Sequence, residues 1–570
     1  MRVLLLHPED DSIATFMRKG PWDAIFDLGA GGRAAPEFSR PVRPIPKAQF
    51  ADLRSIKKLF ARGIGRIIDS VGFDWWDLIS VEFYEPVLEL LRLQRFVQAS
   101  PPQAQFCITR AGFQSRLLQA LCPGRVHVSV SRFPTRLREK ARRGLRLRSR
   151  QIVQILADKY DGDYKVRRFL SHRHRLNSTP VVLLPSAYGN ASRMALAYAE
   201  ALPDIRFLLV ATRQSGWVNA PPANVICTLL AAFASGTLGE HEFQHLLAAW
   251  RGLAAEFNGE TNLALLARAG CFDSVPDLLR QGLAIRNAWV EVFASQPVAS
   301  VLCADEMNWH TSLPLLIARS RNLPAVACHH GALDLRYSFH PTSADRFLAK
   351  GTMERDYLVE ACGMDEEKIE IAAPPVHAIP AGPGRESIVF FSEPYEAFGG
   401  RSPGYYQQLL PPLANLAHKH NCELVLKLHP FESRRERTRL ASDLLSANLR
   451  RLVRIVDGPL DDELMGRAWF GVTVTSSAAV DCAMREVPAF LCQWLDFSPN
   501  RYADQFVQFG AAKALAAADE IPQIPDMLKN FARPDLQSLW QTAEPDRLRK
   551  LILGYRETRG HARSVECAWV

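Results

Sequence analysis

A histidine followed by proline is the first feature of this sequence that is suited to chemistry. Lys427-Leu428-His429-Pro430 ends an apolar run at 423–428 that predicts a buried strand of a parallel sheet. Such a strand end places the imidazole at the carboxyl edge of the sheet, and Pro430 turns the chain away at once. The ring can then donate to a phosphate oxygen, with the Lys427 ammonium adding positive charge. The alternative is a histidine whose ring is bonded to a carbonyl group.

A run of three hydroxyl residues, Thr475-Ser476-Ser477, is the second feature. It lies between a predicted strand and a helix predicted at 478–485. Ser476 or Ser477 is a natural N-cap, and the same geometry presents free N–H groups and the positive end of the helix dipole to an anion. Capping explains one hydroxyl but not three, so we expect an anion site. Asp481, one turn into the helix, either accepts from ribose hydroxyls or complements the helix dipole.

Two adjacent histidines close a predicted strand in the first part of the chain. The apolar run 325–328 leads into His329-His330-Gly331, and glycine lets a backbone approach a ligand closely. Neighbouring side chains at a strand end point to opposite sides. We therefore expect one histidine to be structural and His330, beside the glycine, to face a ligand.

Three carboxylates follow predicted strands and are candidate general bases. Asp305 and Glu306 come after the run 301–304, where a solvated loop is the alternative interpretation. Glu393 lies in the turn after 387–391 and is expected to reach the same site. This turn contains glycines but no GxGxxG, so a bound dinucleotide cofactor is not predicted.

The elements that must position these residues follow an α/β pattern. At 570 residues the chain is too long for a single core, which stops growing at ~250–300 residues. Short apolar runs alternate with amphipathic stretches, as in parallel sheets wrapped by helices. We predict two Rossmann-like doubly wound domains facing a cleft: 1–375 with a helical insertion at 224–295, then 386–530, and a final helix and tail at 531–570.

Proline and glycine at 372–385 predict a linker between the two domains. Pro545 is expected to start or kink the second half of the last helix, 535–555. The strands predicted before the linker are 3–6, 24–28, 78–83, 106–109, 126–130, 181–184, 207–211, 301–304 and 325–328. After it, strands are predicted at 387–391, 423–428, 453–456, 469–474 and 489–491, with helices at 411–420, 435–447 and 478–485.

The positive charge of the chain is concentrated in one segment. Lys and Arg number 69 against 60 Asp and Glu, a net charge of +9, and the segment 131–150 holds nine basic residues against Glu139 alone. Its basic patch, which includes Arg142, Arg143, Arg146 and Arg148, is either a solvated helix or loop, or a surface for an anionic membrane or polyanionic acceptor. No nucleic-acid-binding module accompanies it, so a nucleic-acid partner is not predicted.

The cysteines and the N-terminus predict a cytoplasmic protein. The eleven cysteines include no CxxC and no spacing typical of a zinc site. The apolar run 3–6 is far shorter than the core of a signal peptide, and no stretch reaches the roughly 18–20 apolar residues of a membrane span. Attachment to a membrane would therefore be peripheral, at the inner face of the cytoplasmic membrane.

Taken together, these residues resemble the GT-B fold glycosyltransferases that use nucleotide-activated donors. The resemblance is strongest to the bacterial capsule and cell-wall group with HP and S motifs, which includes sialyl-, polysialyl- and Kdo-transferases and CDP-glycerol glycerophosphotransferases. It covers roughly 301–494 and rests on the Asp305 strand end, the His330-Gly331 turn, the segment 350–369, Lys427-Leu428-His429-Pro430, and Ser476-Ser477 with Asp481 and Pro488.

The resemblance implies a role for each of these motifs. His429, Ser476 and Ser477 would hold the donor phosphate, and Asp481 would bind the ribose. The N-terminal domain would then take the acceptor and the C-terminal domain the nucleotide. This chain departs from the family pattern at Glu486, where the family has glycine, and the acidic-acidic-Gly base motif of sialyltransferases is not evident.

We therefore expect a glycosyltransferase that moves a sugar, or a polyol phosphate, from a CMP-, CDP- or UDP-linked donor to a surface-polysaccharide or lipid-linked glycan acceptor. Such a role fits capsule polysaccharide or lipopolysaccharide synthesis. Glu393, Asp305, Glu306 and His330 are the candidate catalytic residues. No Asp-x-Asp stands at a strand end, so neither a metal nor another cofactor is predicted. The alternatives are an enzyme similar to non-hydrolysing UDP-sugar 2-epimerases and a non-catalytic polyanion-binding protein.

Overall fold

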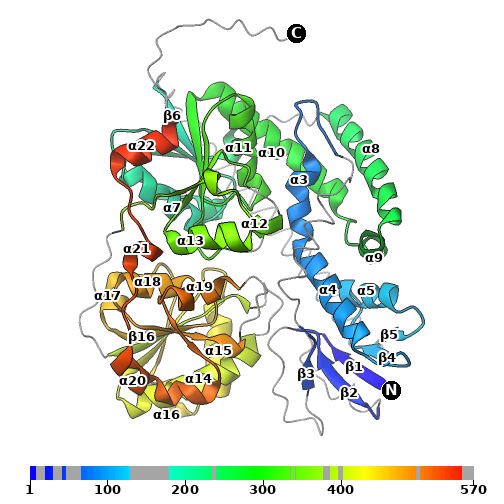
Figure 1. Cartoon of the computed structure of the whole chain (residues 1–570), viewed down its shortest axis with the longest axis vertical. Helices are drawn as coiled ribbons and strands as arrows, with labels where there is room; N and C mark the ends of the chain where they lie inside the picture. Colours follow the sequence, from blue (N-terminus) through cyan, green and yellow to red (C-terminus); the bar gives the residue numbers. More distant parts are fainter. Residues whose placement is uncertain are drawn as a thin grey trace, which may run out of the picture.

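Three parallel sheets with helices packed on them make up the protein (Figure 1). The structure, a computed structural model, describes residues 1–7, 20–29, 42–46, 66–128, 179–233, 239–333, 336–339, 342–376, 386–395, 402–495 and 501–554. The predicted α/β class with doubly wound parallel sheets is confirmed. The segment predicted as one N-terminal domain, 1–375, contains two of the three sheets.

The first sheet has five strands and was not separated from the second by the sequence pattern. Its order is β3 (Val42–Pro44), β2 (Ala24–Asp27), β1 (Arg2–Leu6), β4 (Gln105–Ile108) and β5 (Val126–Val128). The helices α4 (Tyr84–Gln98) and α5 (Phe113–Leu121) lie between β3 and β5 in the chain and share the core of this sheet. The whole basic segment 131–150, with its four named arginines, lies outside the described residues.

The strand predicted at 78–83 is wrong, because these residues are helical. They belong to α3 (Trp75–Ile79) and the 3₁₀ turn Ser80–Phe83. The Asp74 side chain caps α3 by accepting from the Trp76 N–H at 3.0 Å. Trp75 and Trp76 are both buried, so the local cap and tertiary packing outweigh the apolar run that favours a strand.

The second sheet has seven strands in the order β12 (Ile369–Ile371), β11 (Arg346–Ala349), β10 (Ala325–Cys328), β9 (Val298–Cys303), β6 (Val181–Ser186), β7 (Phe207–Ala211) and β8 (Val225–Leu229). Alternate residues of β6 enter two different hydrophobic cores, Leu183 on one face and Leu184 on the other. Both faces are therefore covered, as in a doubly wound sheet.

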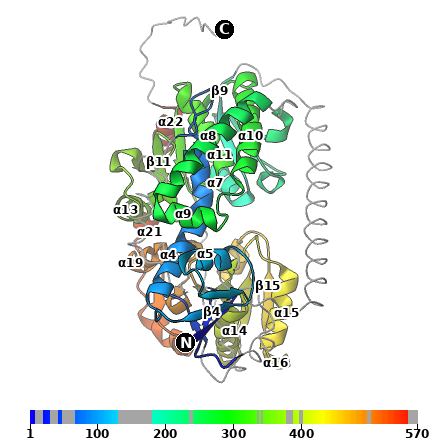
Figure 2. The same cartoon turned by 90° about the vertical axis from the view of Figure 1, so that its right-hand side faces the viewer.

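The helical insertion is shorter than the predicted 224–295, because its first residues form the strand β8. Its helices are α8 (Glu240–Glu256), α9 (Thr261–Arg268) and α10 (Val275–Ser295). Trp76 stacks on Trp250 of α8 with ring centroids 6.0 Å apart. The Arg286 guanidinium of α10 pairs with the buried Asp69 carboxylate at 2.6 Å. These contacts tie the insertion to α3, and Figure 2 shows α8 and α9 on the outer side of the molecule.

The third sheet has six strands, β15 (Val453–Val456), β14 (Glu423–Lys427), β13 (Ser387–Phe391), β16 (Ala468–Thr473), β17 (Ala489–Cys492) and β18 (Lys513–Leu515), in that order. The helix predicted to start at 411 begins earlier, as α14 (Ser402–Lys419). Pro411 and Pro412, predicted in the first turn, therefore lie inside the helix. The earlier turns are held by Tyr405 and Leu409, which are buried in the core.

The last helix returns to the second sheet. After α21 (Leu536–Leu539), the chain forms a bridge between Thr542 and Ala373, and Pro545 starts α22 (Pro545–Leu553) as predicted. Leu548, Leu551 and Ile552 share a hydrophobic core with β6. Figure 1 shows α22 at the seven-stranded sheet and α21 between the two larger sheets. No helix of the described residues is long and apolar enough to cross a membrane.

Strand order reverses once in each larger sheet, between β6 and β9 and between β13 and β16. Ligands of doubly wound sheets bind outside the carboxyl ends of the strands at such a reversal. The turns after β6, β9, β13 and β16 are therefore the places where a site is expected.

Substitutions at two glycines inside helices can test how closely α10 packs on α3. A Cβ on Gly282 would lie 2.1 Å from a ring carbon of Trp75, whereas a Cβ on Gly252 in α8 would meet nothing within 4 Å. We expect Gly282→Ala to lower the free energy of unfolding by about 1–3 kcal/mol, because a packed core resists added atoms. Gly252→Ala should raise it by up to ~1 kcal/mol, because alanine is the better helix former. Urea denaturation measures both, and equal effects would contradict this close approach.

Candidate functional site

The carboxyl edges of the two larger sheets meet at the predicted motifs. The Tyr188 ring, after β6, lies 6.3 Å from the Phe431 ring, after β14, between centroids. A Cβ built on Gly331, after β10, would lie 3.9 Å from Ser477 Oγ, after β16. We call the following group the interdomain site: Tyr188, Asp305 and His330 from the second sheet, and His429, Phe431 and Ser477 from the third.

His429 presents a neutral N–H donor to this site. Its Nδ1 accepts from the Phe431 N–H at 3.2 Å, so Nε2 carries the proton. Burial, and then the charges of His330 and Lys427, lower the pKa of His429 to about 4. The ring is therefore neutral at pH 7, and no group of the described residues is bonded to its Nε2. It can donate one hydrogen bond to a phosphate oxygen without carrying a charge.

The turn that carries His429 is held by Glu432, which the sequence motifs do not single out. Glu432 Oε2 accepts from the His429 N–H at 2.9 Å. Its Oε1 accepts from Arg437 Nε at 2.7 Å and from Ser392 Oγ at 2.8 Å. Strand β14 ends at Lys427, before the exposed Pro430, and the buried Glu432 carboxylate fixes the direction of the turn.

Lys427 was predicted to point into the site, but its side chain does not reach it. Its ammonium is buried and donates to the Gly458 carbonyl at 2.6 Å and to the Leu428 carbonyl at 3.2 Å. Burial, followed by the charge of Arg193, lowers its pKa. The side chain therefore ties the end of β14 to a neighbouring loop and contributes charge only from behind the site.

Glu393 is a positioning residue, and the prediction of a general base at this position is corrected. Its buried carboxylate accepts from Thr473 Oγ1 at 3.0 Å, from the N–H groups of Val474 and Thr475 at 3.1 and 2.7 Å, and from Thr475 Oγ1 at 2.5 Å. One bond comes from Thr473, the last residue of β16, and the other three come from the turn that follows. Glu393 thus shapes that turn, and the Thr475 hydroxyl is used within the protein.

Ser476 caps the next helix, whereas the Ser477 hydroxyl is left to face the site. Ser476 Oγ accepts from the Ala478 N–H at 3.2 Å, so this hydroxyl caps α18 (Ala478–Met484). Ser477 occupies the N-cap position without a capping bond from its side chain, and its hydroxyl faces Gly331. Because α18 has only seven residues, the Ser477 hydroxyl and His429 are better placed than a helix dipole to hold an anion. The exposed Asp481 lies 3.8 Å from Arg485 Nη1.

Glu486 stands where the family pattern has glycine, and its backbone conformation shows why glycine is favoured at this position. Glu486 has φ +59°, in the left-handed region that glycine adopts at no cost. Helix α18 therefore ends in the turn that the glycine pattern implies, although a glutamate occupies it. The Glu486 carboxylate pairs with Arg533 at 3.0 Å.

On the opposite side, Tyr188 joins Asp305 to His330. Its hydroxyl donates to Asp305 Oδ2 at 2.6 Å and lies 3.3 Å from His330 Nε2, while His330 Nδ1 lies 3.3 Å from the Ala304 carbonyl. Burial, and then the Asp305 charge, raise the pKa of Tyr188, so the phenol keeps its proton. Tyr188 was missed in the sequence, although its place shortly after the predicted strand 181–184 was a usable signal.

His329 and Glu306 are hydrogen-bonded to groups outside the interdomain site. The two ring nitrogens of the buried His329 lie 3.1 Å from the Ala332 carbonyl and 3.3 Å from the Tyr337 hydroxyl. Glu306 Oε2 accepts from Thr342 Oγ1 at 2.8 Å and from the Ser343 N–H at 2.9 Å. Glu306 is buried and is therefore neither the predicted base nor part of a solvated loop.

The surroundings of Asp305 favour anions over a metal ion. Asp305, His329 and His330 bring ligand-type atoms within 4.8 Å of one another. However, each is engaged in the hydrogen bonds above. Burial raises the pKa of Asp305, and the Tyr188 bond and the positive charge of Arg336 oppose that shift. Arg336 and Arg213, which have no sequence motif, place positive charge near Asp305.

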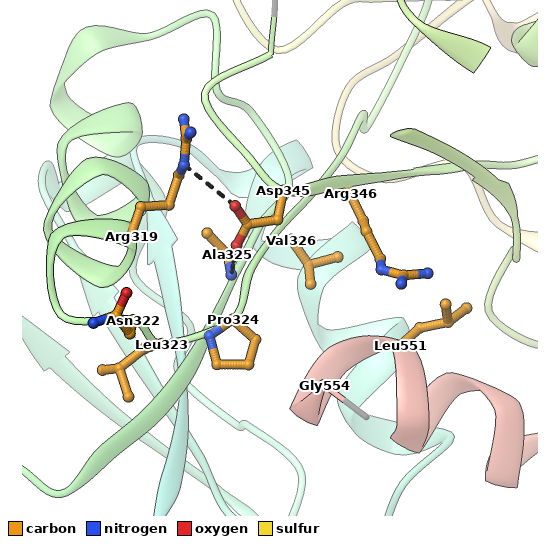
Figure 3. Close-up of a pocket in the computed structure, with 10 residues that line it drawn as sticks. All are labelled: Arg319, Asn322, Leu323, Pro324, Ala325, Val326, Asp345, Arg346, Leu551 and Gly554. Atoms are coloured by element: carbon orange, nitrogen blue, oxygen red, sulfur yellow. Dashed lines mark hydrogen bonds and ion pairs between the residues drawn. The ribbon is translucent and has the colours of Figure 1, made fainter. Parts of the chain in front are cut away.

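A hollow of about 540 Å³ lies at the other, amino edge of the second sheet (Figure 3). Arg319 on its wall pairs with Asp345 at 3.2 Å, and Arg346 pairs with Glu370 at 2.9 Å. The starts of β10 and β11 and the end of α22 complete the wall. Doubly wound sheets bind ligands at the carboxyl edge, so this hollow is not the candidate site.

Comparison with known proteins finds similarity only among solved structures. No family model and no curated protein sequence matches the chain. A UDP-GlcNAc 2-epimerase from Methanocaldococcus jannaschii in complex with UDP-GlcNAc and UDP is 10% identical over 65% of this chain and 99% of that chain, with a TM-score of 0.41. A glycosyltransferase from Rickettsia africae is 10% identical over 66% and 93%, with a TM-score of 0.38. Values of this size say nothing about activity, so function has to follow from the side chains of the site.

Because Glu306 is buried, the free energy of unfolding should depend on pH. Burial raises its pKa to about 7, above the unfolded value of 4.5, so the folded state holds a proton that the unfolded state loses between these pH values. Stability should therefore fall by about 3 kcal/mol from pH 4.5 to above pH 7 through this group. In Glu306→Gln that loss should disappear. Urea denaturation at pH 5 and pH 8 compares the variant with wild type and with the exposed control Glu82→Gln, and identical pH slopes would contradict the assignment.

Proposed function

We propose that the chain is a GT-B-type enzyme that transfers a sugar from a nucleotide-activated donor to a hydroxyl group of a glycan acceptor. The meeting of two chemically different sheet edges supports it. One edge offers the neutral His429 Nε2–H and the Ser477 hydroxyl to a phosphate. The other offers His330, connected to Asp305 through Tyr188, to an acceptor.

On the donor side, the leaving phosphate gains negative charge as the glycosidic bond breaks. Donors already in place stabilise that charge more effectively than water does, because they need no reorganisation. His429 and Ser477 supply such donors from the third sheet. Arg193, in the first turn of α7 (Gly189–Glu200), adds positive charge from the second sheet, close enough to lower the pKa of Lys427.

On the acceptor side, His330 is the proposed general base. With its Nδ1–H donated to the Ala304 carbonyl, the Nε2 lone pair is the basic position. The acceptor hydroxyl gives its proton to Nε2 as its oxygen bonds to the anomeric carbon and the bond to the phosphate oxygen breaks. The Asp305 charge, acting through the Tyr188 hydroxyl, stabilises the imidazolium that forms.

The nucleotide, the acceptor and the membrane contact belong to the same proposal. We propose a CMP-, CDP- or UDP-linked donor, with Asp481 at the ribose and no requirement for a divalent metal, since cationic and neutral protein donors surround the phosphate position. A surface-polysaccharide or lipid-linked acceptor would bring the enzyme to an anionic leaflet through the basic patch with Arg142, Arg143, Arg146 and Arg148. An epimerase would use the same phosphate contacts but would release an isomerised nucleotide-sugar.

Loss of the His429 donor tests the phosphate side. We expect wild type to bind at least one of CMP, CDP, UDP and GDP in a thermal-shift screen and to turn over the matching nucleotide-sugar without added metal. His429→Ala should reduce turnover about 100-fold or more, as when one oxyanion donor is removed. His420→Ala is the matched control, because that exposed histidine packs on Trp469 away from the site.

Absence of nucleotide binding by wild type, or full activity of His429→Ala, would reject the transferase proposal. Formation of an isomerised nucleotide-sugar without transfer would identify an epimerase instead.

Replacement of His330 tests the acceptor side separately. His330→Ala should lose about 10²–10⁴ in turnover, the usual contribution of a general base, and should keep the nucleotide affinity of wild type. Tyr188→Phe removes only the hydroxyl that links Asp305 to His330, so it should have a smaller effect in the same direction. Isothermal titration and single-turnover kinetics separate the two quantities. Equal loss of affinity in His330→Ala and His429→Ala would mean that His330 is not the base.

A further inference from the structure

Phe431 is an apolar side chain exposed inside the interdomain site. Its side chain is 67% exposed, the largest value among the large hydrophobic residues of the described parts of the chain. Single exposed apolar residues are common and need no explanation on a plain surface. This one, however, directly follows the turn that carries His429.

The Phe431 ring lies between the two halves of the site. Its centroid is 5.0 Å from the His429 ring, at an interplanar angle of 62°. It is 6.3 Å from the Tyr188 ring, at 68°. Tyr188 in turn lies 5.0 Å from His330. Both neighbours meet Phe431 at a steep angle, and no ring of the described residues stacks parallel to it.

The backbone holds the ring in this place. The Phe431 N–H donates to His429 Nδ1 at 3.2 Å, so the bond that sets the tautomer of the histidine also fixes Phe431 beside it. The neighbouring Glu432 carboxylate anchors the same turn through His429 N–H and Arg437. The exposed ring is therefore presented on a rigid support.

From this position we infer that Phe431 is the platform for the sugar ring carried by the donor. The inference rests on the proposed function: the group in transfer has to lie between the phosphate at His429 and the base at His330. Phe431 contacts both sides of that gap, through His429 and Tyr188. The apolar C–H face of a ring sugar can stack on an aromatic face, whereas an acyclic polyol has no such face. Phe431 thus favours a ring sugar over a polyol phosphate.

The nucleoside has a different place in this arrangement. The turn after β16 leads from Ser477 into α18, where Asp481 is exposed. A nucleoside held at Asp481 would contact α18, the helix of the third sheet that follows Ser477. Phe431 lies on the side that faces Tyr188 of the second sheet, where the transferred group belongs.

The test compares the same nucleotide with and without its sugar. Isothermal titration would measure UDP and UDP-glucose, and CDP and CDP-glycerol, against wild type, Phe431→Ala and Phe431→Tyr. Phe431→Ala should keep its affinity for UDP and CDP within about two-fold and should lose about ten-fold or more for UDP-glucose. Phe431→Ala should change the affinity for CDP-glycerol by no more than it changes the affinity for CDP. Phe431→Tyr, which keeps the aromatic face, should behave as wild type.

Ile226→Ala is the matched control, because it shortens an exposed apolar side chain on the edge strand β8. An equal loss for UDP and UDP-glucose in Phe431→Ala would show that the ring serves the nucleoside or the fold, and would overturn the inference. An unchanged affinity for UDP-glucose would also overturn it. If wild type binds none of the four ligands and none of the nucleotides in the CMP, CDP, UDP and GDP screen, the proposed function itself fails, which is a separate result from either outcome with Phe431→Ala.

Discussion

The buried carboxylate of Glu393 is the interaction on which the donor half of the site depends. It comes from the turn after β13 and accepts four hydrogen bonds from the last residue of β16 and the turn that follows it, and β16 is the neighbour of β13 at the reversal of strand order. A buried carboxylate without such partners would be costly, so the turn has little freedom to open. Ser476 can then cap α18 while Ser477 turns its hydroxyl toward the second sheet.

The acceptor half has a similar construction around the Tyr188 hydroxyl. It bonds to Asp305, which follows β9, and it contacts His330, which follows β10. In each half a residue at one strand end organises its neighbours across the point where the strand order reverses. These bonds are buried or partly buried, which makes them stronger than they would be at the surface. Phe431 bridges the halves by ring contacts alone, which suits a surface that has to admit a ligand.

Much of the architecture could be predicted because it is encoded locally. Apolar runs such as 181–184 and 387–391 are strands, and the Pro545 start of α22 follows from proline stereochemistry. The errors have local causes too. Residues 78–83 have a strand-like composition, but the Asp74 cap and the burial of Trp75 make them helical. The separate five-stranded sheet was missed because a chain of alternating strands and helices does not reveal where one sheet ends and the next begins.

The sequence by itself determined which chemical groups stand at the ends of strands, among them His429, Ser477, His330 and Asp305, because strand periodicity and the carboxyl-edge rule are local. Only the tertiary structure decided which of these groups are available to a ligand. The charged groups of Glu393 and Lys427 are hydrogen-bonded to Thr475 and Gly458 in turns of the third sheet. The buried Glu306 carboxylate is hydrogen-bonded to Thr342. The bond between Glu393 and Thr475 spans 82 residues, and no local pattern records such a contact. A buried charge takes whichever partners the packed turns bring to it, and those partners come from distant parts of the chain.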